Sequence, residues 1–360
     1  KRLVGDEHPP LLIAEMSGNH NQSLDRAIKI VDAVAAAGVE VLKLQTYTAD
    51  TMTMNIQHDQ FRILDKKSSW CGRYLYDLYH EAHTPWKWHQ TIFDHCRELG
   101  LTVISTPFDE TAVDFLESLE TPFYKIASFE INHIPLIRKV GSTGKPIIFS
   151  TGTANLSDIE RAVKTAQKSG CNDIILLQCT STYPASNAST NLAAIPLMRD
   201  VFGCLIGLSD HTMGMGAAIG AVALGACVIE KHVTISRSDG GVDSAFSMEA
   251  DEVAIFLKEL NAVYEAIGKP RIGPGDEEVA NLKYRRSIYV SRNTKAGAIL
   301  SEENLKIIRP GHGLPPRYWD QVVGKIARRD LKPGDPLKWD MIEFCAADGK
   351  GGHSIERKMP

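Results

Sequence analysis

Two histidines, His211 and His232, each follow an apolar segment that ends in charged or polar residues. The first segment reads GLSDH and the second reads VIEKH. If these segments are neighbouring strands of one sheet, the two rings lie close enough to hold a divalent metal ion, because neutral imidazole suits Mn, Fe, Co or Zn. The alternative is a structural role, in which each ring is hydrogen-bonded within the core.

Two lysines lie inside segments that otherwise read as buried strands, Lys43 in VLKLQT and Lys125 in FYKIAS. A buried ammonium group is costly unless it meets an anion. One such lysine can be neutralised by a carboxylate of the chain, whereas two together favour an anionic ligand such as a phosphate. A Schiff base between a desolvated lysine and a carbonyl substrate is a third option. The two histidines and many hydroxyl groups favour anion binding beside a metal.

The elements that position these residues alternate along the chain between residues 11 and 268. Short β-branched segments are followed by longer amphipathic ones, and eight such repeats predict an α/β fold, a (β/α)8 TIM barrel. A doubly wound open sheet is the alternative, although no GxGxxG follows the first strand. Strands are predicted at 11–15, 41–46, 102–107, 123–128, 146–152, 173–180, 205–210 and 227–233.

The carboxyl-terminal ends of the predicted strands are unusually polar. In a barrel these ends converge on one site. The polar residues there are Glu15, Lys43, Gln45, Thr106, Lys125, Ser128, Thr151, Ser181, Ser209, Asp210, His211, Glu230 and His232. Because the eighth strand closes against the first, we expect Glu15 and Glu230 beside the histidines, as ligands, bases or partners of the rings.

Four further parts of the chain depart from a simple alternation. Residues 47–84 are too long for an ordinary connection, and they form a lid, a partner-binding element or a segment that only packs on the surface. We predict a barrel domain at 1–268, a linker at 269–285, a small β-rich domain at 286–345 and a loosely held polar tail at 346–360.

Composition excludes several classes of function. The 360 residues carry a formal net charge of −4, so no broad positive field for nucleic acid is expected. The longest apolar segment, GAAIGAVALGACVI, is too short and too rich in glycine to span a membrane. The seven cysteines contain no CxxC pair and no signal peptide is recognised, so we expect a cytoplasmic protein with free thiols.

A series of motifs resembles the sialic acid synthase family, in the same order along the barrel. These motifs are IAEMSGNHNQSLDRA, VLKLQTYTADTMTMN, ISTPFD, YKIASFEI, CTSTYP, GLSDHTMG and VIEKHVT. RPGHGLPPRYWDQVVGKIARRDL then resembles the antifreeze-like (SAF) domain of those enzymes, so the resemblance covers residues 10–343. Within the family, QTYTADTMTMN, residues 70–89, CTSTYP and MSGNHN are most like the pseudaminic acid synthase branch.

The resemblance implies a condensation of phosphoenolpyruvate with the open-chain aldehyde of 2,4-diacetamido-2,4,6-trideoxy-L-altrose and with water. The products are a nine-carbon 2-keto acid and phosphate, which leaves by C–O cleavage. Glu15 and Glu230 would be catalytic, and His211 and His232 would hold a divalent metal, with Mn favoured over Mg or Co. Phosphoenolpyruvate would be bound by Lys43, Gln45, Thr106, Lys125, Ser128, Ser181 and Ser209, and the sugar by Glu130, Tyr183, Asp243 and Arg309.

Arg309 lies in the SAF segment, and in the family this arginine reaches the sugar from the partner subunit. The resemblance therefore implies a domain-swapped homodimer. Three alternatives stay open: an N-acetylneuraminate or legionaminic acid synthase acting on a different acetamido sugar, a metal-dependent aldolase that uses pyruvate, and a non-enzymatic protein that binds ice or carbohydrate.

Overall fold

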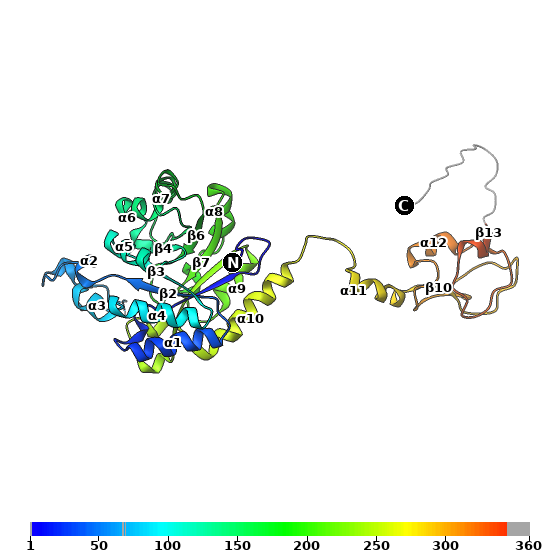
Figure 1. The fold of residues 1–360 in the computed structure, drawn as a ribbon. Coiled ribbons are helices and arrows are strands. Elements are labelled where there is room, and N and C mark those ends of the chain that lie inside the picture. The colour runs from blue at the N-terminus through cyan, green and yellow to red at the C-terminus, as the bar shows by residue number, and fades with distance from the viewer. Residues whose placement is uncertain (1, 67, 69, 344–360) are drawn as a thin grey trace. The chain divides into compact units, whose positions relative to one another are not determined.

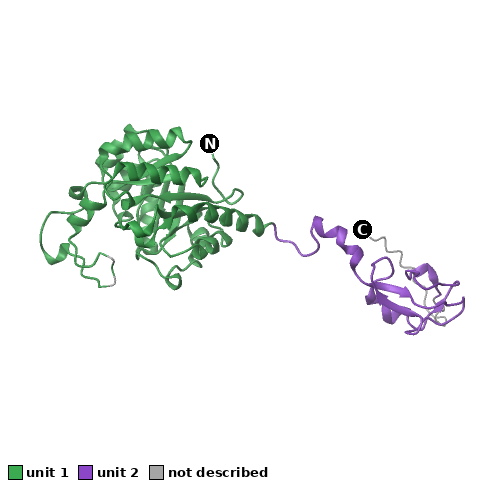
Figure 2. Ribbon diagram, turned by 90° about the horizontal axis from the view of Figure 1, so that it is seen from below, with its two compact units in different colours: residues 1–268 green, residues 269–360 purple. Residues whose placement is uncertain are grey.

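The computed structural model describes residues 2–66, 68 and 70–343. The chain divides into two compact units, Lys1–Gly268 and Lys269–Pro360 (Figure 2). Each unit is described separately below. The predicted tail at 346–360 lies outside the described residues.

The first unit is a barrel of parallel strands surrounded by helices (Figure 1). The strands are β1 (Leu11–Glu15), β2 (Val41–Thr46), β3 (Thr102–Pro107), β4 (Tyr124–Ile126), β5 (Ile147–Ser150), β6 (Ile174–Cys179), β7 (Leu205–Asp210) and β8 (Val228–Thr234). The helices that follow them are α1 (Leu24–Ala36), α4 (Trp86–Glu98), α5 (Glu110–Ser118), α6 (Ile134–Gly141), α7 (Leu156–Lys168), α8 (Ala194–Phe202), α9 (Gly216–Ala223) and α10 (Ala250–Ile267).

The strand order is that of a closed barrel. Hydrogen-bonded neighbours run β3-β2-β1-β8-β7-β6-β5-β4, and β3 and β4 lie side by side at the remaining seam. A short strand, β9 (Met248–Glu249), adds to β8. The eighth strand pairs with the first, so that Glu15 lies opposite His232 in register. The predicted (β/α)8 barrel is confirmed, and the alternative of an open sheet is wrong.

The interior of the barrel changes from apolar to polar along the strands. Alternate side chains of a barrel strand point inward. One buried apolar cluster includes Leu11, Ile13, Val41, Ile104, Ile148, Leu177 and Val228. Two positions further along the same strands lie Glu15, Lys43, Thr106 and Glu230, which are all buried. The apolar half packs the barrel, and the polar half forms its carboxyl-terminal end.

Local signals in the sequence set the ends of several helices. The side chain of Asn155 accepts hydrogen bonds from the backbone N–H groups of Ser157 and Asp158, and Asp158 completes the capping box at the start of α7. Gly38 and Gly100 follow α1 and α4 with φ of 81° and 77°, a backbone region that favours glycine. These caps shorten the connections that return the chain to the next strand.

Residues 47–84 leave the barrel after β2 and contain α2 (Ala49–Met52), a 3-10 turn (Asp59–Phe61) and α3 (Leu75–Ala82). Their ends are tied to the barrel. Trp86 donates to the carbonyl of Tyr47 at 3.2 Å, and Gln22 donates to the carbonyls of Glu81 and His83 at 2.8 and 2.7 Å. Both ends of the segment are therefore fixed to the first unit.

The second unit has its own apolar core, which includes Ile288, Val290, Leu300, Leu305, Leu314, Val322 and Leu337. Its elements are α11 (Asp276–Val279), β10 (Ser287–Val290), β11 (Leu305–Ile308), α12 (Trp319–Val322), β12 (Ile326–Ala327) and β13 (Ile342–Glu343). The segment predicted as a linker thus contains the short helix α11. Among the residues with described positions, the helices are too short or too polar to cross a bilayer.

Candidate active site

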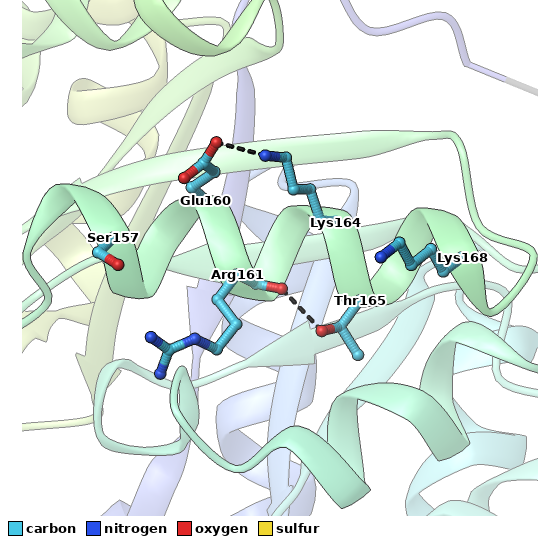
Figure 3. Close-up of a pocket in the computed structure, with 6 residues that line it drawn as sticks. All are labelled: Ser157, Glu160, Arg161, Lys164, Thr165 and Lys168. Carbon is cyan, nitrogen blue, oxygen red and sulfur yellow. Dashed lines mark hydrogen bonds and ion pairs between the residues drawn. The ribbon is translucent and has the colours of Figure 1, made fainter.

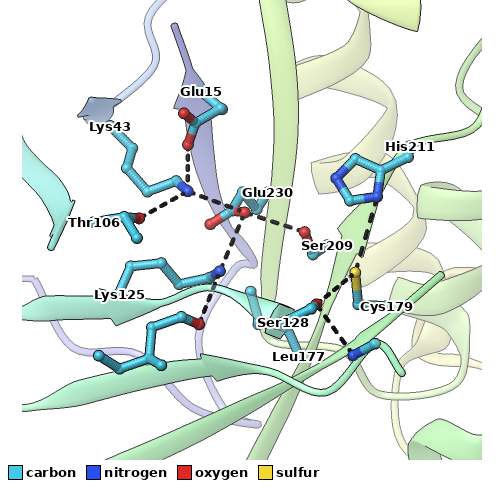
Figure 4. Close-up of polar contacts among 12 residues, drawn as sticks. Glu15, Lys43, Thr106, Lys125, Ser128, Leu177, Cys179, Ser209, His211 and Glu230 are labelled. Atoms are coloured by element: carbon cyan, nitrogen blue, oxygen red, sulfur yellow. Dashed lines mark hydrogen bonds and ion pairs between the residues drawn. The ribbon is translucent and has the colours of Figure 1, made fainter. Parts of the chain in front are cut away.

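A cluster of two lysines and two glutamates occupies the polar half of the barrel (Figure 4). Lys43 of β2 forms an ion pair with Glu15 of β1 and lies 3.3 Å from Oε1 of Glu230. Lys125 of β4 approaches the same oxygen of Glu230 from another side, at 3.5 Å. Lys43 also donates a hydrogen bond to Thr106, at 3.3 Å. Glu230 on β8 therefore joins both lysines.

The pairing within this cluster is incomplete. Apart from the ion pair with Lys43, neither carboxylate oxygen of Glu15 has a hydrogen-bond partner among the described residues, and the same holds for Oε2 of Glu230. Lys125 has its ion-pair distance of 3.5 Å to Glu230 and a hydrogen bond of 3.3 Å to the carbonyl of Ile126. Carboxylate oxygens only accept hydrogen bonds, so these positions suit groups that donate, such as water or a substrate hydroxyl, while the loosely held Lys125 suits an anion.

The electrostatics of the cluster separate the two carboxyl groups. Burial raises the pKa of Glu15 to about 7, although Lys43 opposes the shift. Burial acts on Glu230 in the same direction, but Lys125 and Lys43 together hold the pKa of Glu230 well below its usual range. Glu230 is therefore ionised, whereas Glu15 exchanges a proton near neutral pH.

His211 and His232 lie beside this cluster, with ring centroids 5.3 Å apart. Nδ1 of His211 is 3.0 Å from the carbonyl oxygen of Thr180, so this nitrogen carries the proton and donates. Burial holds the pKa of His232 well below its usual value. Its Nδ1 atom is buried without a hydrogen-bond partner in the described structure, 4.0 Å from Oδ2 of Asp243.

These two histidines fit a divalent metal that takes two ligands from the protein. Both rings are buried, the Thr180 contact leaves Nε2 of His211 free to coordinate, and His232 has an unpaired nitrogen. Within residues 2–66, 68 and 70–343, no group of three or more histidine, cysteine or acidic side chains is arranged around an ion position. The remaining ligands would then be water or substrate oxygens.

Hydroxyl and thiol groups line the side of His211 that faces β4, β5 and β6. Sγ of Cys179 lies 3.4 Å from Oγ of Ser128 and 3.9 Å from Nδ1 of His211. Ser128 accepts a hydrogen bond from the backbone of Gly152 at 3.1 Å, and Ser181 is 3.8 Å from Cys179. On the neighbouring strand β7, Ser209 lies opposite Cys179 in register and donates to Glu230 at 3.1 Å (Figure 4).

The residues predicted to bind the sugar occupy different places. The ring of Tyr183 lies 4.5 Å from that of His211, and buried Asp243 accepts a hydrogen bond from Ser17. Glu130 follows β4, and burial raises its pKa to about 7. Arg309 is an exposed residue of the second unit.

One predicted residue has a less specific position. Gln45 is half-buried in β2, opposite Thr106 in the strand register.

Three neighbours of the site were not found from the sequence. Ser17 holds Asp243 across 226 positions of the chain, Phe246 lies 5.0 Å from His232 between ring centroids, and Trp70 contacts Tyr183. Ser17 and Trp70 lie in two of the quoted motifs, MSGNHN and residues 70–89, but neither these two nor Phe246 was given a role, because each reaches the site from outside the barrel strands. The polarity of the strand ends is a local signal, and it identified most of the others.

A pocket on α7 has a different character (Figure 3). It is lined by Ser157, Glu160, Arg161, Lys164, Thr165 and Lys168, which all come from one helix. Glu160 and Lys164 form an exposed ion pair one helical turn apart. The pocket contains none of the residues predicted for the site, and its side chains are those of an ordinary solvated helix surface.

The fold and the site define a synthase-type barrel followed by a SAF domain. The model of the NeuB family matches residues 30–271, and the model of the SAF domain matches residues 285–343. The chain belongs to the NeuB family, as the motifs predicted.

Three known proteins illustrate this relationship. The chain is 39% identical to the pseudaminic acid synthase of Helicobacter pylori, over 93% of this chain and 98% of that protein. It is 32% identical to the N,N'-diacetyllegionaminic acid synthase of Campylobacter jejuni, over 91% and 98%. The solved N-acetylneuraminic acid synthetase of Leptospira borgpetersenii, in complex with citrate, matches 76% of this chain and 90% of its own, with a TM-score of 0.68 and 29% identity.

Proposed function

We propose that this chain is a pseudaminic acid synthase. It condenses phosphoenolpyruvate with 2,4-diacetamido-2,4,6-trideoxy-L-altrose and water to give a nine-carbon 2-keto acid and phosphate. C3 of phosphoenolpyruvate bonds to the aldehyde carbon, water adds to C2, and phosphate leaves as the C2–O bond breaks. The main support is the pair of buried lysines, of which Lys125 has only long contacts, beside two buried histidines. The higher identity to the pseudaminic than to the legionaminic acid synthase supports the choice of sugar.

Phosphoenolpyruvate carries a phosphate and a carboxylate, which match the two lysines. With both glutamates ionised, Lys43, Lys125, Glu15 and Glu230 sum to zero charge. When Glu15 takes up a proton the cluster has a net charge of +1, which favours an anion in this desolvated place. The hydrogen bonds to the substrate oxygens come from Gln45, Thr106, Ser128 and Ser181, and from Ser209 when its hydroxyl turns from Glu230 to the substrate.

The two carboxyl groups have different tasks. Glu230 stays ionised and holds both lysines in position. Glu15, which is protonated when phosphoenolpyruvate binds, gives this proton to the aldehyde oxygen as C3 bonds to the aldehyde carbon. As a carboxylate it then accepts a proton from the water that adds to C2, and the proton of the resulting C2 hydroxyl leaves with phosphate.

His211 and His232 are the residues that would hold a divalent ion, with Mn favoured and Mg or Co as alternatives. Such an ion supplies Lewis-acid polarisation of the aldehyde oxygen. The Thr180 carbonyl fixes the ring of His211. Treatment with EDTA should abolish phosphate release, and metal should restore it in the wild type but not in His211→Ala or His232→Ala. Full activity in EDTA contradicts the metal assignment.

The sugar is held by Glu130, Tyr183 and Asp243 of the barrel, and Arg309 reaches it from the SAF domain of a partner subunit in a domain-swapped homodimer. Arg309→Ala and Lys125→Met should each lower activity, and mixing the two proteins, followed by subunit exchange, should raise it again, because some sites then receive intact residues from both chains. Failure to complement, with mixed dimers demonstrated, contradicts the swap.

The cysteines with described positions are free thiols, which supports a cytoplasmic location.

The deciding experiment measures phosphate release from phosphoenolpyruvate with a panel of sugars. The panel contains the diacetamido altrose derivative, the corresponding diacetamido mannose derivative and N-acetylmannosamine. The altrose derivative should give the highest kcat/KM. Preference for another sugar of the panel identifies a different synthase of the family. Thermal hysteresis without any phosphate release indicates an ice-binding protein, and condensation of pyruvate without phosphate indicates an aldolase.

A further inference from the structure

Trp70 connects residues 47–84 with the far side of the barrel. Its ring centroid lies 5.6 Å from that of Tyr183, and its indole N–H donates to the carbonyl of Val242 at 2.9 Å. The 47–84 segment follows β2, whereas Tyr183 follows β6 and Val242 follows β8. Strands β2 and β6 are four places apart in the strand order, so they face each other across the barrel. The contact therefore spans the carboxyl-terminal end of the strands.

Trp70 is the outermost of a series of rings that leads to the two histidines. Tyr183 lies 4.5 Å from His211 and 5.3 Å from Phe246 between ring centroids, and Phe246 lies 5.0 Å from His232. On the other side of the histidines is the lysine–glutamate cluster. A ligand between the two sides would meet charge at one end and aromatic surface at the other.

The polar group of Trp70 is already occupied. Because its only N–H is bonded to Val242, the indole offers a neighbouring ligand an apolar face and no additional donor. A hydroxyl group placed against this face loses water without gaining a hydrogen bond, whereas a methyl group gains apolar contact. The wall thus favours a sugar whose outer half carries methyl groups.

We propose that Trp70 is a specificity-determining residue for the acetamido sugar. With Tyr183, which buried Phe246 supports from behind, it forms an apolar wall for the 4-acetamido and C6 methyl groups, and it selects against sugars with hydroxyl groups there. This inference rests on the proposed function, since it concerns the sugar site of the same reaction. It also gives residues 47–84 a role in substrate choice.

The test compares three variants of Trp70 by phosphate release with the diacetamido altrose derivative and with N-acetylmannosamine. Trp70→Ala should lower the ratio of the two kcat/KM values about 10- to 100-fold, mainly through the KM of the diacetamido sugar. The KM of phosphoenolpyruvate should stay unchanged. Trp70→Phe should retain most of the selectivity because it keeps a ring, and Trp70→Gln should lose it. If Trp70→Ala does not fold, the Phe and Gln variants decide.

Trp88→Ala is the matched control. Trp88 of α4 is also half-buried and also packs on a ring, that of His20, with centroids 5.5 Å apart. Its variant should leave the sugar ratio unchanged. Equal losses for both sugars in Trp70→Ala, an equal rise in the KM of phosphoenolpyruvate, or the same change of ratio in Trp88→Ala overturns the inference. A wild-type protein that releases no phosphate with the diacetamido sugar refutes the proposed function instead.

Discussion

Lys125 and Lys231 are both buried in strands of one barrel, yet their ammonium groups have different surroundings. Lys231 donates to Oδ2 of Asp210 at 2.6 Å and to the carbonyl of Thr212 at 2.7 Å. Oδ1 of Asp210 accepts from the backbone and the hydroxyl of Thr212, at 2.9 and 2.8 Å. Lys125 has longer contacts, at 3.5 Å to Glu230 and 3.3 Å to the carbonyl of Ile126.

The two lysines also lie on opposite sides of the barrel wall. Asp210 and Lys231 are partners in the β7–β8 register, two positions after Leu208 and Ile229, which pack in the layer between strands and helices. Lys125 points into the polar half of the interior, toward Glu230. An ion pair with all of its hydrogen bonds formed acts as structure. A cluster whose buried oxygens lack partners is arranged for a ligand that completes it.

The largest effect on stability is expected at the ion pair of Lys231 and Asp210, which we call the outer pair. Lys231→Met leaves Asp210 as a buried charge without its cation, and we expect a loss of about 3–5 kcal/mol in the free energy of unfolding. Denaturant titration measures this. Adding Asp210→Asn removes the remaining charge but keeps an acceptor for Thr212, so the double variant should recover most of the stability. A single variant as stable as the wild type would show that this pair is not structural.

Loss of a lysine from the inner cluster should instead lower activity and leave stability nearly unchanged. This cluster consists of Lys43, Lys125, Glu15 and Glu230. In Lys125→Met the excess negative charge is relieved when Glu15 takes up a proton, so the free energy of unfolding should change little. Its kcat/KM for phosphoenolpyruvate should fall about 10²- to 10³-fold, because a charged contact to the substrate is lost.

Lys164→Met is the surface control for this comparison. Lys164 forms an exposed ion pair with Glu160 on α7, and because water screens such a pair its loss should leave the free energy of unfolding almost unchanged. Its kcat/KM should equal that of the wild type. A Lys125→Met protein that unfolds as Lys231→Met does, or one that keeps full activity, would remove the distinction between the two buried lysines.

Much of this contrast has a source in the sequence. The period of two in a strand places Glu230 and His232 on one face of VIEKHV and Lys231 on the other. The repeat of eight strand–helix units predicted the barrel, and therefore the convergence of Glu15, Lys43, Lys125 and Glu230. The partner of Lys231 was not predicted, because it depends on the register of β7 against β8.

Contacts made by loops had no comparable signal. The hydrogen bond between Ser17 and Asp243 joins positions 226 apart, and Trp70 meets Tyr183 from a segment that follows β2. Strand ends are placed by a regular geometry, whereas a loop of this length has no period from which its contacts follow. The sequence also left the partners of Lys43 and Lys125 open, because a carboxylate of the chain and an anionic ligand explain a buried lysine equally well. The structure contains the carboxylates, with oxygens left unpaired.

The smallest effect concerns the proton on Glu15. Its pKa is raised to about 7 by burial, so the inner cluster has a charge of +1 below that pH and zero charge above it. Equilibrium binding of phosphoenolpyruvate, measured by calorimetry between pH 7 and 9, should weaken by up to about tenfold per pH unit. Glu15→Gln keeps the positive charge at every pH, so its affinity should be nearly constant over this range. Parallel pH profiles for both proteins would exclude Glu15 as the titrating group.

The proton on Glu15 also makes the free energy of unfolding depend on pH, and the raised pKa decides the direction of this dependence. A carboxyl group whose pKa is raised in the folded state binds more protons there than in the unfolded chain, so the free energy of unfolding decreases as the pH rises through about 7. Asp210 has full hydrogen bonding in the outer pair, and Lys231→Met/Asp210→Asn should retain this dependence. Glu15→Gln should remove it. Denaturant titrations at pH 5, 7 and 8.5 measure this dependence on pH. If it persists in Glu15→Gln, or is lost in Lys231→Met/Asp210→Asn, Glu15 is not its source.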